Sequence, residues 1–456
     1  MRRLSPSQDL TLAVRVNAWL DARLDGNVSH PLAIALSGGG DSMALLGLAA
    51  NWAGRNGRGL LAITVDHGLN TESPRWNELC KAAARHLGAE WRLLRWEGDK
   101  PVTGLPAAAR AARHALIADA AREAGAKVIL FAHTADDVAE NAWMRAQGST
   151  LGTLREWSPS PAWPEGRGLM LLRPLLEEHR KTLRQWLVAR QRDWIEDPAN
   201  ADDRFARSRA RHALGLGVEQ ANVAAVQQAT VSIPQKVDPG PIPPVKYLPF
   251  GAGLVVGRST GAATLAAALL CASGKHTPPR RQRLSALVYR LRSGESFVAT
   301  LAGARVMADG EAVTIGREPG RQVIPEMILS PDRPVVWDGR FEITVSRAGY
   351  SLAPAFGRLR ALSKADQQVL QGIPASLRPT LPVLIRDDGT APVLAWRDAT
   401  MTALGPRRLA LALGETTQEC HLHATIHGET PPTDLLSIQE LHQGGPHQPP
   451  TNRETR

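Results

Sequence analysis

The sequence has few cysteines, no long apolar run and no P-loop. Its three cysteines, Cys80, Cys271 and Cys420, are too few and too scattered for a disulfide framework. None belongs to a Cys-x-x-Cys pair, which argues against an iron–sulfur or zinc-knuckle site. No run approaches about 18 apolar residues, and the N-terminus lacks the apolar centre of a leader peptide. These absences favour a soluble, cytoplasmic protein without membrane association.

A Gly-x-x-x-x-Gly-Lys-Ser/Thr motif is also missing, which excludes the P-loop of ATPases that transfer the γ-phosphoryl group. The chain is long and basic instead. Its 456 residues predict about two or three domains. An excess of 54 Lys and Arg over 44 Asp and Glu gives a net charge of +10. Such charge suits a polyanionic partner, although charge alone leaves both nucleic acid and an anionic membrane open.

A glycine loop between a strand and a helix is the most informative local feature. Residues 32–36 are an apolar run that leads directly into Ser37-Gly38-Gly39-Gly40-Asp41-Ser42. Glycines leave out the Cβ atoms where backbone N–H groups must approach phosphate oxygens, and the following helix turns its positive end to the same place. Two serine hydroxyls add donors. The loop predicts a nucleotide-phosphate site, and the alternative is a plain turn.

Short apolar runs alternate with helical patterns up to about residue 132, which predicts an α/β domain with a parallel sheet. We expect strands at 32–36, 60–65, 91–96 and 127–131, and helices at 41–53, 73–87 and 106–124. Ligands bind beyond the carboxyl ends of parallel strands. The glycine loop, Asp66-His67-Gly68 and the segment 133–137 each follow an expected strand, so we expect all three at one edge of the sheet.

Composition changes beyond the sheet. An Arg-rich helical stretch from 175 to about 214 is followed by a proline-rich segment at 232–249, which is typical of a linker. We expect a catalytic domain at 1–215, a linker at 216–249, a basic accessory domain at 250–330, a strand-rich domain at 331–430 and a disordered tail at 431–456. On this division the catalytic domain would fold without the rest of the chain.

Two acids stand side by side after the fourth expected strand. Asp136 and Asp137 lie in the segment 133–141, which also contains Glu140. Adjacent carboxylates repel each other unless a cation compensates them, and Mg²⁺ bound to ATP would do so. The alternative is a helix N-terminus that carries acids to match its dipole.

Four arginines without an acid among them form a second charged cluster. They are Arg204, Arg207, Arg209 and Arg211. Such a run repels itself unless polyphosphate, acidic neighbours or solvent disperses the charge, and arginine also stacks on unpaired bases. We therefore predict a nucleic-acid contact, with a solvated helix face as the alternative. The acid-free segment 275–292 is a second candidate RNA surface.

Together these motifs resemble those of tRNA(Ile)-lysidine synthases. The glycine loop looks like the PP-loop of the N-type ATP pyrophosphatases, and the following motifs occur in the order and spacing of the family: 65–69, 109–113, 133–140, 173–176 and 197–211. The similarity covers residues from about 30 to 212. The chain departs from it at His114, where the family usually has Tyr, and at Asn141, where it usually has Thr.

The resemblance implies a reaction and its participants. ATP would adenylate the C2 carbonyl oxygen of the wobble cytidine in a CAU-anticodon tRNA(Ile), and the ε-amine of free L-lysine would then displace AMP to give lysidine. The resemblance implies that Ser37 and residues 38–42 hold the diphosphate and that Asp66 and His67 lie beside adenosine. Asp41 and Asp137 would hold Mg²⁺, and Asp136 and Asp137 would hold metal or the target base. Arg113, with Arg110, would neutralise phosphate charge. Rival hypotheses are another PP-loop ligase such as a tRNA thiolase, or a tRNA-binding protein with a degenerate site. A homodimer is left open.

Overall fold

The N-terminal half contains a mixed sheet of six strands in the order β3-β2-β1-β4-β6-β5. The computed structural model describes residues 6–149, 154–155, 157–159, 163, 165–196, 206–220, 245–320 and 324–423. The strands of this sheet are β1 (Leu32–Ala35), β2 (Leu60–Asp66), β3 (Glu90–Arg95), β4 (Val128–Leu130), β5 (Trp157–Pro159) and β6 (Met170–Leu172). The first four confirm the predicted strands, and all neighbours are parallel except β5, which runs antiparallel to β6. The strands β5 and β6 were not predicted.

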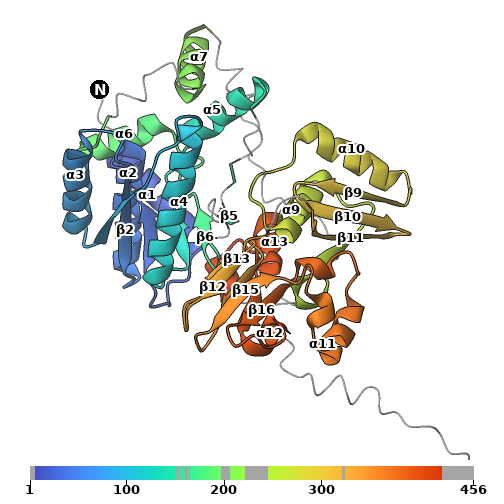
Figure 1. Cartoon of the computed structure of the whole chain (residues 1–456). Helices are drawn as coiled ribbons and strands as arrows, with labels where there is room; N and C mark the ends of the chain where they lie inside the picture. Colours follow the sequence, from blue (N-terminus) through green and yellow to red (C-terminus); the bar gives the residue numbers. More distant parts are fainter. Residues whose placement is uncertain are drawn as a thin grey trace, which may run out of the picture.

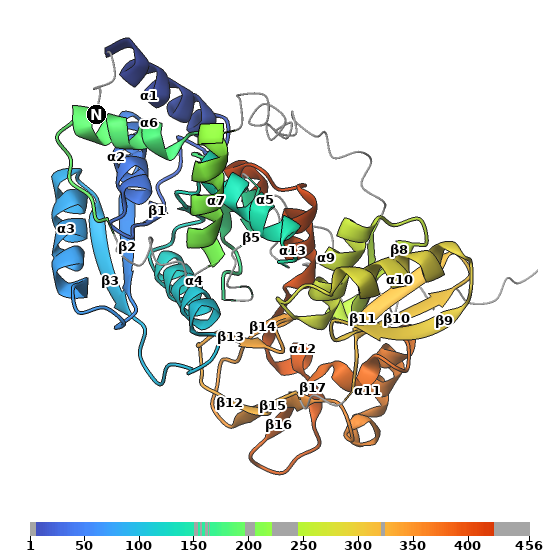
Figure 2. The ribbon, with the colours of Figure 1, turned by 90° about the horizontal axis from the view of Figure 1, so that it is seen from above.

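Helices cover both faces of this sheet (Figures 1 and 2). The helices on the two faces are α1 (Pro6–Asp21), α2 (Gly40–Arg55), α3 (Ser73–His86), α4 (Leu105–Glu123) and α6 (Arg180–Ala189). The helices α5 (Ala135–Ala146) and α7 (Ala206–Gln220) pack against each other. Alternation along the strands explains the layers, because successive side chains point to opposite faces. Leu32 and Ile34 belong to one core with α1, α2, α3 and α6, whereas Ala33 belongs to a second core with α4.

The N-terminal segment forms the helix α1, which the sequence did not predict. Leu12, Val16 and Leu20 recur every fourth residue and are buried in the first core, which is the spacing of a helix face. Within the segment 216–249, where the sequence suggests a linker, α7 extends to Gln220, and β7 (Lys246–Tyr247) pairs with β8 (Gly253–Gly257). Residues 221–244 lie outside the described residues.

The C-terminal half is rich in antiparallel strands, as predicted. A five-stranded sheet in the order β7-β8-β11-β10-β9 contains β8 (Gly253–Gly257), β9 (Phe297–Leu301), β10 (Ala304–Asp309) and β11 (Ala312–Arg317). The helix α9 (Ala262–Ser273) packs on it, and α10 (Arg281–Arg292) packs on α9. Basic residues of the predicted RNA surface are therefore carried by α10.

Two smaller sheets complete this half. One has the order β12-β15-β16-β17 and the other β13-β14-β18. Their elements are β12 (Met327–Leu329), β13 (Val335–Trp337), β14 (Phe341–Thr344), β15 (Tyr350–Pro354), β16 (Pro382–Arg386), β17 (Val393–Leu394) and β18 (Thr400–Ala403), with α11 (Lys364–Val369) and α12 (Ala395–Asp398). Because β12 pairs with β15, the sheet begins before residue 331, where the sequence placed the domain boundary.

The end of the described chain returns to the N-terminal half. Helix α13 (Gly405–Leu413) packs against α9 and also against β5, so it lies between the two halves (Figure 2). Leu411 and Leu422 are buried in the first core, together with residues of β1 and α2. The core of the N-terminal sheet therefore includes residues far beyond position 215. The predicted tail at 431–456 lies outside the described residues, and no described helix has the length and apolar character needed to cross a membrane.

Candidate active site

The glycine loop joins β1 to α2 at the carboxyl edge of the parallel strands. Gly38 has φ +83°, a left-handed conformation that favours glycine. The Oγ of Ser42 donates to the carbonyl oxygen of Gly39 at 2.8 Å and lies 3.1 Å from the Oγ of Ser37. Gly39 caps α2 without a side-chain hydrogen bond. The first N–H groups of a helix lack partners within the helix, so this end suits an anion.

A segment that follows α6 packs on the same loop. The backbone N–H of Ile195 donates to the carbonyl oxygen of Gly38 at 2.9 Å. A Cβ atom on Gly38 would lie 2.2 Å from Cδ1 of Ile195, and one on Gly40 would lie 1.8 Å from Nη1 of Arg184. The glycines are therefore needed for close packing within the protein as well as for the approach of a phosphate that the sequence suggested.

Asp137 combines the two roles that the sequence left open. Its Oδ2 accepts hydrogen bonds from the backbone N–H and the hydroxyl of Thr134, at 2.8 and 2.9 Å, which completes a capping box at the start of α5. Its Oδ1 accepts from Nη2 of Arg180 at 2.7 Å. One oxygen of Asp137 therefore caps the helix, as the alternative proposed. The other oxygen binds Arg180, which in turn binds Asp41 of the glycine loop.

Arg180 is the central residue of the site, and sequence reasoning missed it. Its Nε donates to Oδ2 of Asp41 at 3.1 Å, and its Nη1 contacts Glu140. Its backbone N–H donates to Oδ2 of Asp136 at 2.9 Å. One guanidinium therefore gathers acids from the glycine loop and from α5. The Arg-rich stretch at 175–214 was the only signal, and it did not single out this residue.

Burial and arginines act in opposite directions on the two main carboxylates. Burial raises the pKa of Asp41 above its usual value, although Arg184 and Arg180 lower it. Burial also raises the pKa of Asp137, but Arg180 and the Thr134 backbone N–H outweigh it, and the pKa lies below the usual value. Asp137 is therefore ionised at neutral pH, and Asp41 is the less well compensated of the two.

A group of buried cations lies beside the acids. Burial and the nearby charges of Arg110 and Arg207 lower the pKa of Arg113 to about 10. The Nε of Arg113 is buried without a hydrogen-bond partner. Arg173 donates from Nε to Nδ1 of His133 at 3.0 Å, and burial together with Arg173 lowers the pKa of His133 to about 3. His133 is neutral at pH 7, and the group as a whole favours an anion.

Asp66 and His67 reach the same edge, at the end of β2. Asp66 accepts from the Gly68 backbone N–H at 2.8 Å and from Asn77 at 3.3 Å. His67 is half-buried and contacts the edge of the Trp96 ring, with ring centres 6.0 Å apart. Burial, followed by the charge of Arg113, lowers the pKa of His67. The structure thus brings together the loops after β1, β2 and β4, as predicted.

The arginine cluster on α7 divides between the site and the surface. Nε of Arg211 donates to Oε1 of Glu140 at 2.8 Å, and Nη1 of Arg207 lies 4.0 Å from Oδ1 of Asp137. Arg209 is exposed. Arg204 lies outside the described residues. Two of these arginines therefore compensate Glu140 and Asp137, which is one of the outcomes that an acid-free run allows.

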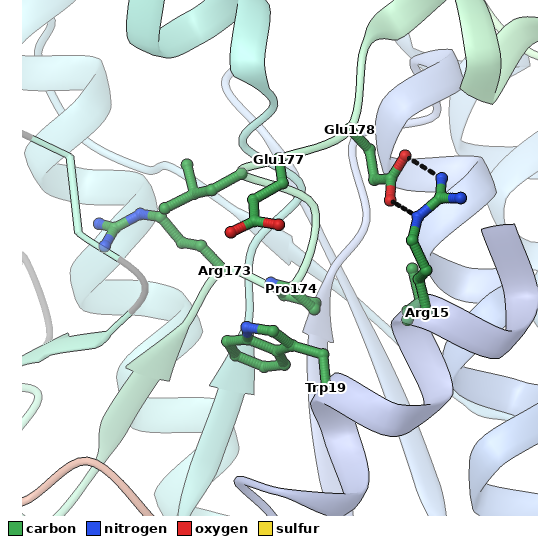
Figure 3. Close-up of a pocket in the computed structure, with 8 residues that line it drawn as sticks. Arg15, Trp19, Arg173, Pro174, Glu177 and Glu178 are labelled. Carbon is green, nitrogen blue, oxygen red and sulfur yellow. Dashed lines mark hydrogen bonds and ion pairs between the residues drawn. The ribbon is translucent and has the colours of Figure 1, made fainter. Parts of the chain in front are cut away.

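The loop at 173–178 is held in place from α1 (Figure 3). Arg15 donates to the two carboxylate oxygens of Glu178 at 2.9 and 2.7 Å, at the side of a pocket that Trp19 and Pro174 also line. The backbone oxygen of Glu178 accepts from Ala135, the first residue of α5. The pair thus supports the end of the helix that carries Asp136 and Asp137.

The chain is similar to known proteins. Residues 11–216 match the model of the PP-loop domain family. The chain is 44% identical over 418 residues to the tRNA(Ile)-lysidine synthase of Caulobacter vibrioides, covering 89% of this chain and 98% of that protein. It is 36% identical to the tRNA(Ile)-lysidine synthase of Hyphomonas neptunium, covering 66% and 86%. Among solved structures, the U34-tRNA thiolase NcsA from Methanococcus maripaludis is similar with a TM-score of 0.40 and 17% identity, over 50% of this chain and 82% of that one. The chain belongs to the tRNA(Ile)-lysidine synthase family.

Proposed function

We propose that the protein joins free L-lysine to C2 of the wobble cytidine in a CAU-anticodon tRNA(Ile) and splits ATP into AMP and diphosphate. ATP-dependent formation of lysidine on tRNA(Ile) is the activity of the family to which the chain belongs. The observation that carries the assignment to this site is the position of Arg180. It binds Asp41 of the glycine loop and Asp137 of α5 at the same time.

The reaction needs two displacements. The C2 carbonyl oxygen of cytidine attacks the α-phosphorus of ATP, and diphosphate leaves. The ε-amine of lysine then attacks C2, the bond from C2 to the adenylate oxygen breaks, AMP leaves, and the amine loses a proton. A pyrimidine carbonyl is a poor electrophile until its oxygen becomes such a leaving group, so the site must stabilise charge on phosphates in both steps.

The glycine loop and the acids divide this task. Ser37, residues 38–40 and Ser42 hold the diphosphate with hydroxyls and backbone N–H groups, while Asp66 and His67 lie beside adenosine. Mg²⁺ is bound in proteins by one or two carboxylates plus substrate phosphates. Asp41 and Asp137 fit that donor set, since both already face one cation, Arg180. The ion would neutralise phosphate charge there.

The buried cations add positive charge to the site. Arg113 has a buried Nε without a hydrogen-bond partner, Arg110 adds a second positive charge, and the two would neutralise charge on the phosphates. Asp136 and Asp137 hold the metal or the target base. Arg209 of α7, which is exposed, and the basic helix α10 supply tRNA contacts, because phosphate contacts position a nucleic acid on its protein. A homodimer remains a prediction.

The decisive assay measures transfer of labelled lysine. Protein, ATP, Mg²⁺, labelled L-lysine and CAU-anticodon tRNA(Ile) should give acid-precipitable label, with AMP and diphosphate formed in equal amounts. Omission of ATP should abolish the label, and methionine tRNA, which shares the anticodon sequence, should be a poor acceptor. A thiolase would leave lysine in solution. Absence of label with folded, ATP-binding protein would contradict the proposal.

A further inference from the structure

The guanidinium of Arg184 lies directly against the loop proposed to hold the diphosphate. A Cβ atom on Gly40 would lie 1.8 Å from its Nη1 and 2.2 Å from its Cζ, so any larger residue at position 40 would displace it. Arg184 belongs to α6 and reaches the loop from outside. The motif at residues 37–42 therefore gave no indication of its presence.

This position is unfavourable for a cation unless an anion accompanies it. The N-terminus of α2 carries the positive end of the helix dipole. Asp41 supplies the anion, with Oδ1 3.0 Å from Nη1 of Arg184, but its Oδ2 is engaged by Arg180. The second acid near Arg184 is Glu196, 3.3 Å from its Nε and 70% exposed, and exposed ion pairs contribute little. Arg184 thus depends on a carboxylate that it shares.

Arg180 and Arg184 differ in how firmly they are held. Arg180 contacts Asp137 and Glu140 as well as Asp41, and the side chains of those two acids are 7% and 2% exposed. Arg184 has only Asp41 as a buried acid partner among the ion pairs of the described residues. Its planar group also stacks on Trp194, 5.4 Å from the ring centre. Stacking leaves the N–H edges of a guanidinium available to an acceptor.

We propose that Arg184 is a phosphate-binding residue that exchanges Asp41 for the diphosphate of ATP. Without nucleotide it neutralises Asp41, and with nucleotide it binds oxygens of the phosphate chain above Gly39 and Gly40, which releases one oxygen of Asp41 for a cation. Guanidinium groups bind phosphate with paired, charge-assisted hydrogen bonds. The inference rests on the proposed function, because it requires a diphosphate on the glycine loop.

Titration calorimetry of the full chain with inorganic pyrophosphate, without Mg²⁺, tests this exchange. Arg184→Gln should weaken pyrophosphate binding by about tenfold to a hundredfold, the loss typical of a hydrogen bond to a charged group. Lys181→Gln is the matched control, since it removes the same charge from an exposed position on α6. Equal affinities of Arg184→Gln and Lys181→Gln would overturn the proposal.

Asp41→Asn supplies a second test, which distinguishes this exchange from an Arg184 that only neutralises Asp41. Removing the carboxylate frees Arg184, so metal-free pyrophosphate should bind more tightly than to the wild type. Asp41 also repels pyrophosphate directly, and loss of that repulsion alone would tighten binding. A gain from that cause would persist when the Asp41→Asn, Arg184→Gln double variant is compared with Arg184→Gln. We expect the gain to disappear there, and a gain that persists would refute the exchange. If the wild type binds neither pyrophosphate nor ATP, the proposed function itself fails.

Discussion

Arg58 and Glu419, which lie 361 positions apart in the chain, form a fully buried bidentate ion pair. Nη1 and Nη2 of Arg58 each lie 2.6 Å from a carboxylate oxygen of Glu419. Nδ1 of His30 lies 3.5 Å from the same carboxylate, which also accepts from the Asp25 backbone N–H. Arg58 lies between α2 and β2, so the pair joins the end of the described chain to the six-stranded sheet, away from the glycine loop.

Loss of this carboxylate should destabilise the whole protein. Glu419→Gln leaves the Arg58 guanidinium buried without its counter-charge, which costs about 3–5 kcal/mol in such pairs. Urea unfolding, followed by circular dichroism, measures the change. Glu295→Gln is the control, because it breaks an exposed pair with Arg290 and should leave the free energy of unfolding nearly unchanged. Similar midpoints for the two variants would show that the buried pair contributes little.

The pair also changes what truncation should do. From the sequence alone, a chain that ends at Val231 should fold and bind ATP. The structure predicts instead that it is unstable, since it lacks Glu419, Leu411 and Leu422. Replacing Arg58 with Met in the truncated chain should recover part of the stability, because an apolar residue needs no counter-charge. Expression yield and melting temperature of both truncated proteins test this expectation.

Features that depend on neighbouring residues could be predicted from the sequence, whereas features that depend on contacts between distant residues could not. The strands β1 to β4 and the glycine loop could be predicted, because alternation and glycine content are local signals. The strand β6 was missed, although it is an apolar run of the same length as β4. Arg180 could not be singled out among the arginines around it, because its role depends on the packing of α6 against α2. Nothing near Glu419 in the sequence points to Arg58.

Asp137→Asn should separate catalysis from stability. The amide keeps the shape of the side chain but removes the charge that faces Arg180, so we expect the rate of lysine transfer to fall by about a hundredfold or more. Weaker capping of α5 should cost only about 1 kcal/mol of stability. The two readouts are turnover at saturating substrates and the free energy of unfolding. Normal turnover would reduce Asp137 to a helix cap.

Arginines of α7 should differ in their effects. Arg209→Ser removes an exposed charge, so the slope of log affinity for tRNA against log salt should fall by about 0.7 to 0.9 if one phosphate contact is lost. Arg211→Ser removes one of the two guanidiniums that contact Glu140 and should slow turnover with little change in that slope. Filter binding at several salt concentrations, beside the lysine-transfer assay, distinguishes them. An equal reduction of the slope in both variants would place both residues on the tRNA surface.

Acid should destabilise the protein through two buried histidines of the active site. Burial lowers the pKa of His133 to about 3 and that of His114 to about 2, whereas an unfolded histidine titrates near about 6.5. Between these values the unfolded state binds more protons, so stability falls as pH decreases below about 6.5, by about 1.4 kcal/mol per pH unit for each histidine.

Asp137 acts in a lower pH window. Its lowered pKa means that its stabilising contribution is complete above the usual aspartate value and is lost only as pH falls below it. The difference between the free energies of unfolding at pH 7.5 and pH 5.0 therefore reports on the histidines and not on Asp137. His133→Gln should unfold with a weaker pH dependence than the wild type in that range, because one titrating group has been removed, while the exposed His86→Gln should keep the full dependence. If both variants lose stability with acid as steeply as the wild type, His133 must already be protonated in the folded state, and the neutral hydrogen-bond acceptor assigned to Arg173 would be wrong.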